Sequence, residues 1–319
     1  MRWKKIFELA DVEVIFIKNP DENFFYFTRV RGVWQDSIAI ITEMDVKIIS
    51  PPLEKKGIFY HSKEELYNIL KDFLEGKKVG FNGDALSYND FIELKKNIKA
   101  KFKDISNKIK EARVIKEKEE IRKIRKSCRI TLEAINKVNI CDKREKEVAF
   151  EIECEISKKA KVAFPTIVAF GKNTSIPHHL PCGKIFSNPC IIDCGAKYDG
   201  YCCDITRSFY GSREKRIYEI VEEALHISID EIREGIKASD VYKKVEKFFS
   251  KYKFKMLHAL GHSIGLNVHD GYSINKKSNF LFKENMVFAV EPAIYTKNFG
   301  IRIEEDILVK KGKAEVISR

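Results

Sequence analysis

Two aspartates flank a short turn within residues 191–206, a segment rich in apolar residues. The Asp199-Gly200 step is the strongest short-range signal for a two-residue hairpin turn. Such a turn places Asp193 opposite Thr206 and brings Asp204 onto the same face as a diagonal neighbour of Asp193. Two carboxylates this close repel each other, and burying them is costly unless a cation neutralises them. An exposed acidic hairpin is the alternative.

Three of the seven histidines, His258, His262 and His269, occur within twelve residues and are separated by glycines. Glycine lets the backbone approach a ligand closely, and neutral imidazole is a common metal ligand. Any one of these histidines alone would more often be structural. Their clustering favours a site.

Two glutamates complete the set of residues that could do chemistry. Glu291 ends the apolar run 286–290, and Glu304 lies inside the strand-like run 302–309. Carboxylates and an imidazole without a thiolate suit manganese, cobalt, iron or zinc in a shared dinuclear site. Strand alternation leaves open which acid faces that site, because Glu304 and the adjacent Glu305 point to opposite faces of a regular strand.

These segments resemble the pita-bread metallopeptidases, which include methionine aminopeptidases, Xaa-Pro aminopeptidases, prolidases and creatinase. The matching patterns are D-x-G and D-x-T-R at Asp193 and Asp204, H-x-x-G-H-x-x-G-L-x-x-H around His262, E-P-x-I-Y at Glu291, and G-x-R-x-E at Glu304. The motif alignment favours Glu304 over Glu305. The resemblance is close over residues 120–319 and looser over the first 110, where it is to the Xaa-Pro and creatinase branch.

The resemblance implies two divalent ions per chain, with manganese or cobalt favoured and iron or zinc as alternatives. Asp204 and Glu304 would bridge the ions, Asp193 would complete one site, and His262 with Glu291 would complete the other. Water held between two such ions is acidic enough to act as hydroxide near neutral pH. No serine or cysteine nucleophile is then required.

The resemblance also assigns roles around the substrate. Glu291 would accept a proton from the water, His178 and His269 would stabilise the tetrahedral intermediate, and His258 would line the substrate site. His179 is adjacent to His178 and could be confused with it. Two further side chains would orient the carboxylates through hydrogen bonds, as metal ligands usually require: Thr206 and Arg302.

Departures from the family pattern bear on the substrate. Ala259 and Ser263 replace frequent glycines, and Asp270 replaces a frequent glutamate. Some prolidases place an arginine shortly after the last histidine of the motif, where this chain has Gly271-Tyr272-Ser273. We therefore expect an Xaa-Pro aminopeptidase acting on peptides with proline second. The alternatives are an Xaa-Pro dipeptidase (prolidase) and, from another class, a non-catalytic pita-bread binding protein that has lost ligand residues.

The elements that must position these residues indicate an α+β protein. We expect a small α/β domain over residues 1–112 and a catalytic pita-bread domain over 113–319. Residues 12–30 predict two strands joined at Asn19-Pro20-Asp21. Apolar residues at three- and four-residue steps from Ile121 to Ile135 predict one long amphipathic helix that crosses the domain boundary near residue 115.

Composition excludes several functions. The 319 residues contain no apolar run of the roughly 20 residues that a bilayer span requires. The N-terminus lacks the features of a secretory signal, so we expect a cytoplasmic protein with its eight cysteines reduced. The net charge of +12 is concentrated between Lys95 and Lys126, a pattern typical of a solvated helix face, and no nucleic-acid motif accompanies it. A homodimer is expected from the family alone.

Overall fold

The computed structural model describes residues 4–31, 36–54 and 57–319. The chain divides into two compact units, Met1–Arg113 and Val114–Arg319. Each unit has its own cluster of buried apolar side chains, so each has a hydrophobic core of its own. None of the described helices is both long enough and apolar enough to cross a bilayer.

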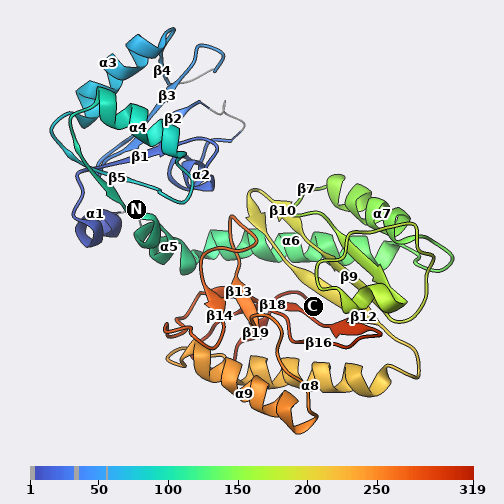
Figure 1. The fold of residues 1–319 in the computed structure, drawn as a ribbon. Helices are drawn as coiled ribbons and strands as arrows, with labels where there is room; N and C mark the ends of the chain where they lie inside the picture. The colour runs from blue at the N-terminus through green and yellow to red at the C-terminus, as the bar shows by residue number, and fades with distance from the viewer. Residues whose placement is uncertain (1–3, 32–35, 55–56) are drawn as a thin grey trace. The chain divides into compact units, whose positions relative to one another are not determined.

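The N-terminal unit is built on a mixed six-stranded sheet in the order β4-β3-β2-β1-β5-β6 (Figure 1). The strands are β1 (Val14–Lys18), β2 (Ile38–Ile41), β3 (Val46–Ser50), β4 (Ile58–Phe59), β5 (Lys78–Phe81) and β6 (Lys101–Asp104). The helices are α1 (Lys4–Ala10), α2 (Glu22–Thr28), α3 (Lys63–Leu74) and α4 (Tyr88–Asn97). β1 pairs antiparallel with β2 and parallel with β5, which gives the sheet its mixed character.

The second strand expected within residues 12–30 is wrong, because helix α2 occupies that position. Asp21 is its N-cap, and the Asp21 side chain accepts a hydrogen bond from the Asn23 backbone N–H at 2.8 Å. Phe24 and Phe27, three residues apart, are both buried. The cap and the three-residue spacing therefore outweigh the strand propensity of the aromatic residues.

The single helix expected across the domain boundary is also wrong. Helix α5 (Ser106–Val114) ends at the boundary, and helix α6 (Lys118–Lys137) begins after it. The break is stabilised by Glu120, whose carboxylate accepts the Glu117 backbone N–H at 2.6 Å at the start of α6. The expected apolar face is present from there on, with Ile121, Ile124, Cys128 and Ile135 buried.

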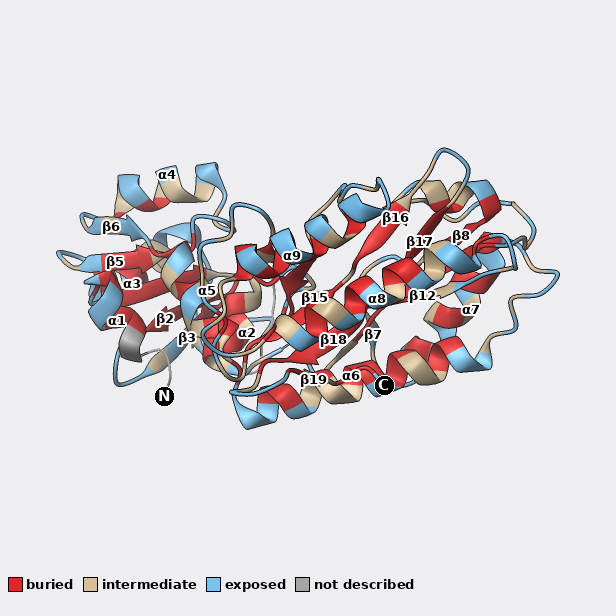
Figure 2. Ribbon diagram, turned by 90° about the horizontal axis from the view of Figure 1, so that it is seen from below, coloured by how far each residue is buried: buried red, intermediate tan, exposed pale blue. Residues whose placement is uncertain are grey.

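The C-terminal unit places its strands between two pairs of helices (Figure 1). Helices α6 and α7 (Glu145–Ser157) lie on one side of the strands, and α8 (Lys215–Glu231) and α9 (Ala238–Lys251) lie on the other. The strands are mostly buried, whereas each helix exposes one face (Figure 2). The apolar core under α8 and α9 therefore anchors the strands that carry the candidate site.

Four small sheets make up this middle layer. The first contains β11 (Tyr201–Cys202), β10 (Ala196–Tyr198) and β7 (Lys161–Val162). The second contains β12 (Ile205–Phe209), β9 (Cys190–Cys194) and β8 (Ile167–Phe170). The third contains β14 (Ser273–Ile274), β13 (Gly261–Ser263), β15 (Val287–Val290), β18 (Glu305–Leu308) and β19 (Glu315–Val316). The last pairs β16 (Ala293–Tyr295) with β17 (Gly300–Arg302). A short 3-10 helix, η1 (Gly171–Ser175), follows β8.

Candidate metal centre and active site

The expected hairpin register is confirmed, because β9 and β12 pair with Asp193 opposite Thr206. The turn residues Asp199 and Gly200 both have positive φ, at 46° and 81°, as a type I′ turn requires. Gly195 lies between β9 and β10, and an added Cβ there would lie 2.1 Å from the Cys203 carbonyl oxygen. Glycine is therefore needed where the chain passes from β9 to β10.

Three of the expected ligands meet at one point in the buried interior. Asp204, His262 and Glu304 bring one ligand atom each within 4.8 Å of the other two. The His262 Nε2 lies 3.5 Å from Asp204 Oδ2, 4.0 Å from Glu304 Oε1 and 3.9 Å from Glu291 Oε1. Residues from a hairpin, from β13 and from the ends of two other strands thus converge, although they are far apart in the sequence.

The orientation of His262 suits a ligand. Its Nδ1 lies 3.0 Å from the Val268 carbonyl oxygen, which can only accept a hydrogen bond, so Nδ1 carries a proton. The Nε2 lone pair of the neutral ring is then directed toward the carboxylates. Burial lowers the pKa of His262 and so favours this neutral form.

The carboxylates of the cluster are too crowded to ionise together without added positive charge. Burial raises the pKa of Asp204 and of Glu304 well above the usual range, and neighbouring carboxylates add to the shift. Burial likewise raises the pKa of Glu291 to about 7. The Asp193 carboxylate also raises all three pKa values.

These residues fit divalent cations. Among the described residues, Asp193 Oδ1 and Asp204 Oδ1 are buried side-chain atoms without a hydrogen-bond partner. Buried carboxylate oxygens are normally paired, so such atoms call for a cation. The donors are oxygens and one imidazole nitrogen, the set that borderline and hard divalent ions prefer.

Arg302 links the ligands to one another. Its Nη2 donates to Asp193 Oδ2 at 2.6 Å, and its Nε donates to Thr206 Oγ1 at 3.1 Å. The Thr206 hydroxyl in turn donates to Glu304 Oε2 at 2.7 Å. Arg302 also donates to the hydroxyl of Tyr295 at 2.6 Å, a residue to which the sequence analysis assigned no role although it ends the E-P-x-I-Y segment.

The structure also separates Glu304 from its neighbour Glu305. Glu304 lies between β17 and β18, outside regular strand, and its side chain faces His262. Glu305 instead accepts from Arg207 at 3.2 Å and from Arg319 at 3.1 Å. Strand alternation therefore holds here, since the two adjacent acids point to opposite sides, and Glu304 is the one that shares the side of Arg302 and His262.

The remaining expected histidines lie around this cluster. His258 Nδ1 lies 3.8 Å from Glu291 Oε2. The rings of His269 and His262 have centroids 4.1 Å apart, and His269 is exposed. His178 is exposed too. Partial desolvation of the His269 ring lowers its pKa, and nearby His178 adds to that shift. The backbone before His178 is held by Arg302, whose Nη1 donates to the Pro177 carbonyl at 3.0 Å.

A buried ion pair that the sequence analysis missed supports the histidine loop. Lys116 Nζ lies 3.3 Å from Asp270 Oδ2, and the two side chains are only 1% and 3% exposed. An added Cβ on Gly265 would lie 2.2 Å from the Asp270 carboxylate, so glycine leaves the space that this pair occupies. The signal was a lysine directly after the apolar Val114-Ile115 step, but its partner 154 residues away is not readable from sequence.

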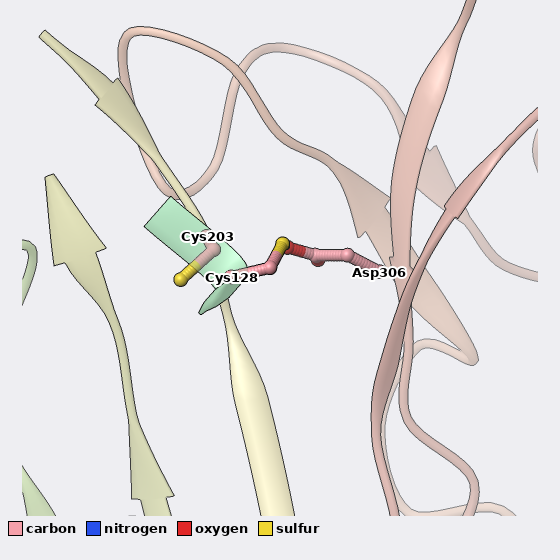
Figure 3. Close-up of side chains that lie close together, drawn as sticks. All are labelled: Cys128, Cys203 and Asp306. Carbon is pink, nitrogen blue, oxygen red and sulfur yellow. The ribbon is translucent and has the colours of Figure 1, made fainter. Parts of the chain in front are cut away.

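A second buried cluster consists of Cys128, Cys203 and Asp306, whose ligand atoms lie within 4.8 Å of one another (Figure 3). Cys128 directs its sulfur toward the Asp306 carboxylate, whereas the sulfur of Cys203 points away from it. Asp306 Oδ2 accepts the Cys128 thiol at 3.4 Å and the Asp204 backbone N–H at 3.2 Å. Burial raises the pKa of Asp306 to about 8 and that of Cys128 well above its usual value. All eight cysteines are free thiols.

Comparison with known proteins identifies the family. The model of metallopeptidase family M24 matches residues 122–311, and the model of the creatinase/prolidase N-terminal domain matches residues 2–115. The chain belongs to metallopeptidase family M24. It is therefore a peptidase that uses divalent metal ions, and the non-catalytic alternative is set aside.

Individual relatives of this M24 peptidase cover most of its length. It is 38% identical over 273 residues to an uncharacterized peptidase of Methanocaldococcus jannaschii, covering 80% of this chain and 79% of that protein. It is 31% identical over 342 residues to an Xaa-Pro dipeptidase of Pyrococcus horikoshii, covering 99% of this chain and 96% of that protein.

Solved structures show the same architecture. The structure of a dipeptidase from Pyrococcus horikoshii superposes with a TM-score of 0.90 at 30% identity, covering 100% of this chain and 98% of that one. An X-Pro aminopeptidase from Thermotoga maritima gives a TM-score of 0.88 at 27% identity, covering 99% of this chain and 97% of that one. The M24 peptidase thus has the α+β architecture expected, a pita-bread fold preceded by a smaller α/β domain.

Proposed function

We propose that this M24 peptidase hydrolyses the bond between an N-terminal residue and a following proline, and that Xaa-Pro dipeptides are its preferred substrates. The convergence of His262 with three carboxylates carries the catalytic part of the proposal. The preference for dipeptides is supported by relatives named Xaa-Pro dipeptidase that match nearly the whole chain, from Pyrococcus horikoshii and Pyrococcus furiosus. This reverses the preference that the sequence analysis expressed for an aminopeptidase.

Xaa-Pro aminopeptidase activity is the second candidate. It is favoured by the likeness to the Thermotoga maritima enzyme and by Gly271-Tyr272-Ser273, which provides no arginine after the last histidine of the motif. A dipeptidase needs a cation for the substrate carboxylate, and an aminopeptidase does not need one at that position. Substrate length therefore separates the two candidates.

We propose that two divalent ions, manganese or cobalt, are held by five side chains: Asp193, Asp204, His262, Glu291 and Glu304. Iron and zinc are the alternatives. The chemistry that a bound pair supplies is the acidification of water, which makes hydroxide available near neutral pH. Thr206 and Arg302 keep the carboxylates in place through the hydrogen bonds described above.

The other residues act on protons and on the substrate. Glu291 accepts the proton of the attacking water. Its two carboxylate oxygens lie 3.8 Å from His258 Nδ1 and 3.9 Å from His262 Nε2. His178 and His269 donate hydrogen bonds to the oxygen that becomes negatively charged as the peptide bond is attacked. His258 lines the substrate site. Because Arg302 holds the backbone beside His178 and also binds Asp193, the substrate and ligand residues share one rigid support.

The test compares matched substrates on the protein refilled with single metals. The metal-free chain is loaded with Mn²⁺, Co²⁺, Fe²⁺ or Zn²⁺ and assayed on Xaa-Pro, Xaa-Pro-Yaa and Xaa-Ala peptides with the same first residue. We expect the highest kcat/KM on the Xaa-Pro dipeptide and negligible turnover of Xaa-Ala. A higher kcat/KM on the tripeptide would establish the aminopeptidase instead, and equal turnover of the alanine peptide would remove the proline preference.

A further inference from the structure

A second group of potential ligands, Glu145, His179 and Cys182, includes the residue that follows His178 in the chain. Glu145 is the first residue of α7, and its side chain is fully buried. Its Oε2 lies 2.8 Å from His179 Nε2 and 2.9 Å from Cys182 Sγ. The three ligand atoms all lie within 4.8 Å of one another.

The carboxylate is oriented before any ligand binds. Its other oxygen, Oε1, accepts the Phe170 backbone N–H at 2.7 Å and the Asn173 side-chain amide at 2.8 Å. Burial opposes ionisation of Glu145, but hydrogen bonds from Cys182, His179 and the backbone outweigh it and hold its pKa below the usual value. A negative charge is thus fixed with Oε2 directed at an imidazole and a thiol.

The donor set differs from that of the catalytic cluster because it contains sulfur. One carboxylate oxygen, one imidazole nitrogen and one thiol match the ligand types of zinc and of other thiophilic divalent ions. Hard ions such as Mn²⁺ and Mg²⁺ avoid thiolate. Cys182 is exposed and the His179 side chain is 12% exposed, so an ion reaches these atoms from solvent.

The spacing requires only a small adjustment. Tetrahedral zinc with ordinary bond lengths separates its ligand atoms by roughly 3.3–3.6 Å. The present separations of 2.8 Å and 2.9 Å from Oε2 must therefore open by about 0.5 Å, which a backbone shift of the segment carrying His179 and Cys182, outside helices and strands, provides. The Cys182 thiol loses its proton to solvent on binding, and the proton on His179 Nε2 moves to Nδ1 through solvent, so no electron transfer is involved.

We propose that Glu145, His179 and Cys182 form a separate site for a thiophilic divalent ion of the zinc class, distinct from the catalytic pair. A water or buffer ligand completes the coordination on the exposed side. Since His178 is next to His179, occupancy of this site displaces His178. This consequence, unlike the site itself, rests on the proposed role of His178 in catalysis. Displacements of this size at a substrate-positioning residue reduce kcat/KM by about tenfold.

The binding test uses Cd²⁺ as the probe, because cadmium bound to thiolate has an ultraviolet charge-transfer band. The full chain carries an Asp204→Asn substitution, which weakens the catalytic cluster, and is titrated with Cd²⁺. We expect the thiolate band to appear with one ion per chain. The band should be lost in Cys182→Ser, which preserves a hydrogen-bond donor to Glu145, and weakened in His179→Ala. Cys154→Ser removes an exposed cysteine on α7, the helix that begins with Glu145, and as the matched control it should retain the band.

The inference is wrong if the band is absent, if it survives Cys182→Ser, or if it disappears in Cys154→Ser. The activity test is separate: Zn²⁺ added to the manganese-loaded enzyme should inhibit the unmodified chain about tenfold and leave Cys182→Ser much less affected. Equal inhibition of both would refute the coupling to His178. Failure to hydrolyse Xaa-Pro peptides would count against the proposed function but would leave the cadmium band, and hence the site, unaffected.

Discussion

Replacing Lys116 by methionine should destabilise the catalytic unit strongly. Methionine preserves most of the apolar length of the lysine side chain but removes the charge that faces Asp270 across 3.3 Å. Both side chains are almost fully buried, so the Asp270 carboxylate would remain in the interior without this partner. Removing one partner of a buried ion pair costs about 3–5 kcal/mol, far more than the loss of an exposed pair.

The size of the effect follows from that cost. For a unit of this length, about 2–4 °C of melting temperature is lost per kcal/mol, so about 6–20 °C is expected. Far-UV circular dichroism of the metal-free protein measures the transition. Tryptophan fluorescence is unsuitable because both tryptophans, at positions 3 and 34, lie outside Val114–Arg319. Lys118→Met is the matched control, since Lys118 is exposed nearby, and it should leave the melting temperature within about 2 °C.

The double variant Lys116→Met/Asp270→Asn tests the reasoning further. Because it removes both charges, it should be less destabilised than the sum of the two single variants. A melting temperature for Lys116→Met within about 2 °C of the unmodified chain would refute the claim that this pair is energetically important. Additivity in the double variant would show that the two residues act independently.

Three further predictions concern the metal centre. His262→Ala should lower the metal content after dialysis. His269→Ala should retain metal, but its kcat/KM should fall by about 10²–10⁴-fold. An unchanged kcat/KM in His269→Ala would exclude His269 from the mechanism. Thr206→Val should weaken metal affinity by about 10–100-fold in equilibrium dialysis, because the hydroxyl no longer links Arg302 to Glu304, and unchanged affinity would contradict this linking role. Glu304→Gln should reduce metal content more than Glu305→Gln, and the reverse order would assign the ligand to Glu305.

Local patterns in the sequence were sufficient for several parts of this protein. The Asp199-Gly200 turn determined the register of its hairpin, since a two-residue turn leaves few alternatives for the pairing of adjacent strands. The three- and four-residue apolar spacing determined the buried face of α6. Segments whose residues suit both a helix and a strand were less predictable. Residues 22–28 form a helix, with Asp21 as its N-cap, although their aromatic residues also favour a strand.

The tertiary structure alone decided how the site is assembled. Alternation along the chain separates Glu304 from Glu305, but only contacts between distant segments decide that Glu304, and not Glu305, faces His262. The ion pair of Lys116 with Asp270 joins residues 154 positions apart. Residue types and spacing specify which side chains can bind a metal, but the distances between them are set by contacts across the fold, which no local pattern encodes.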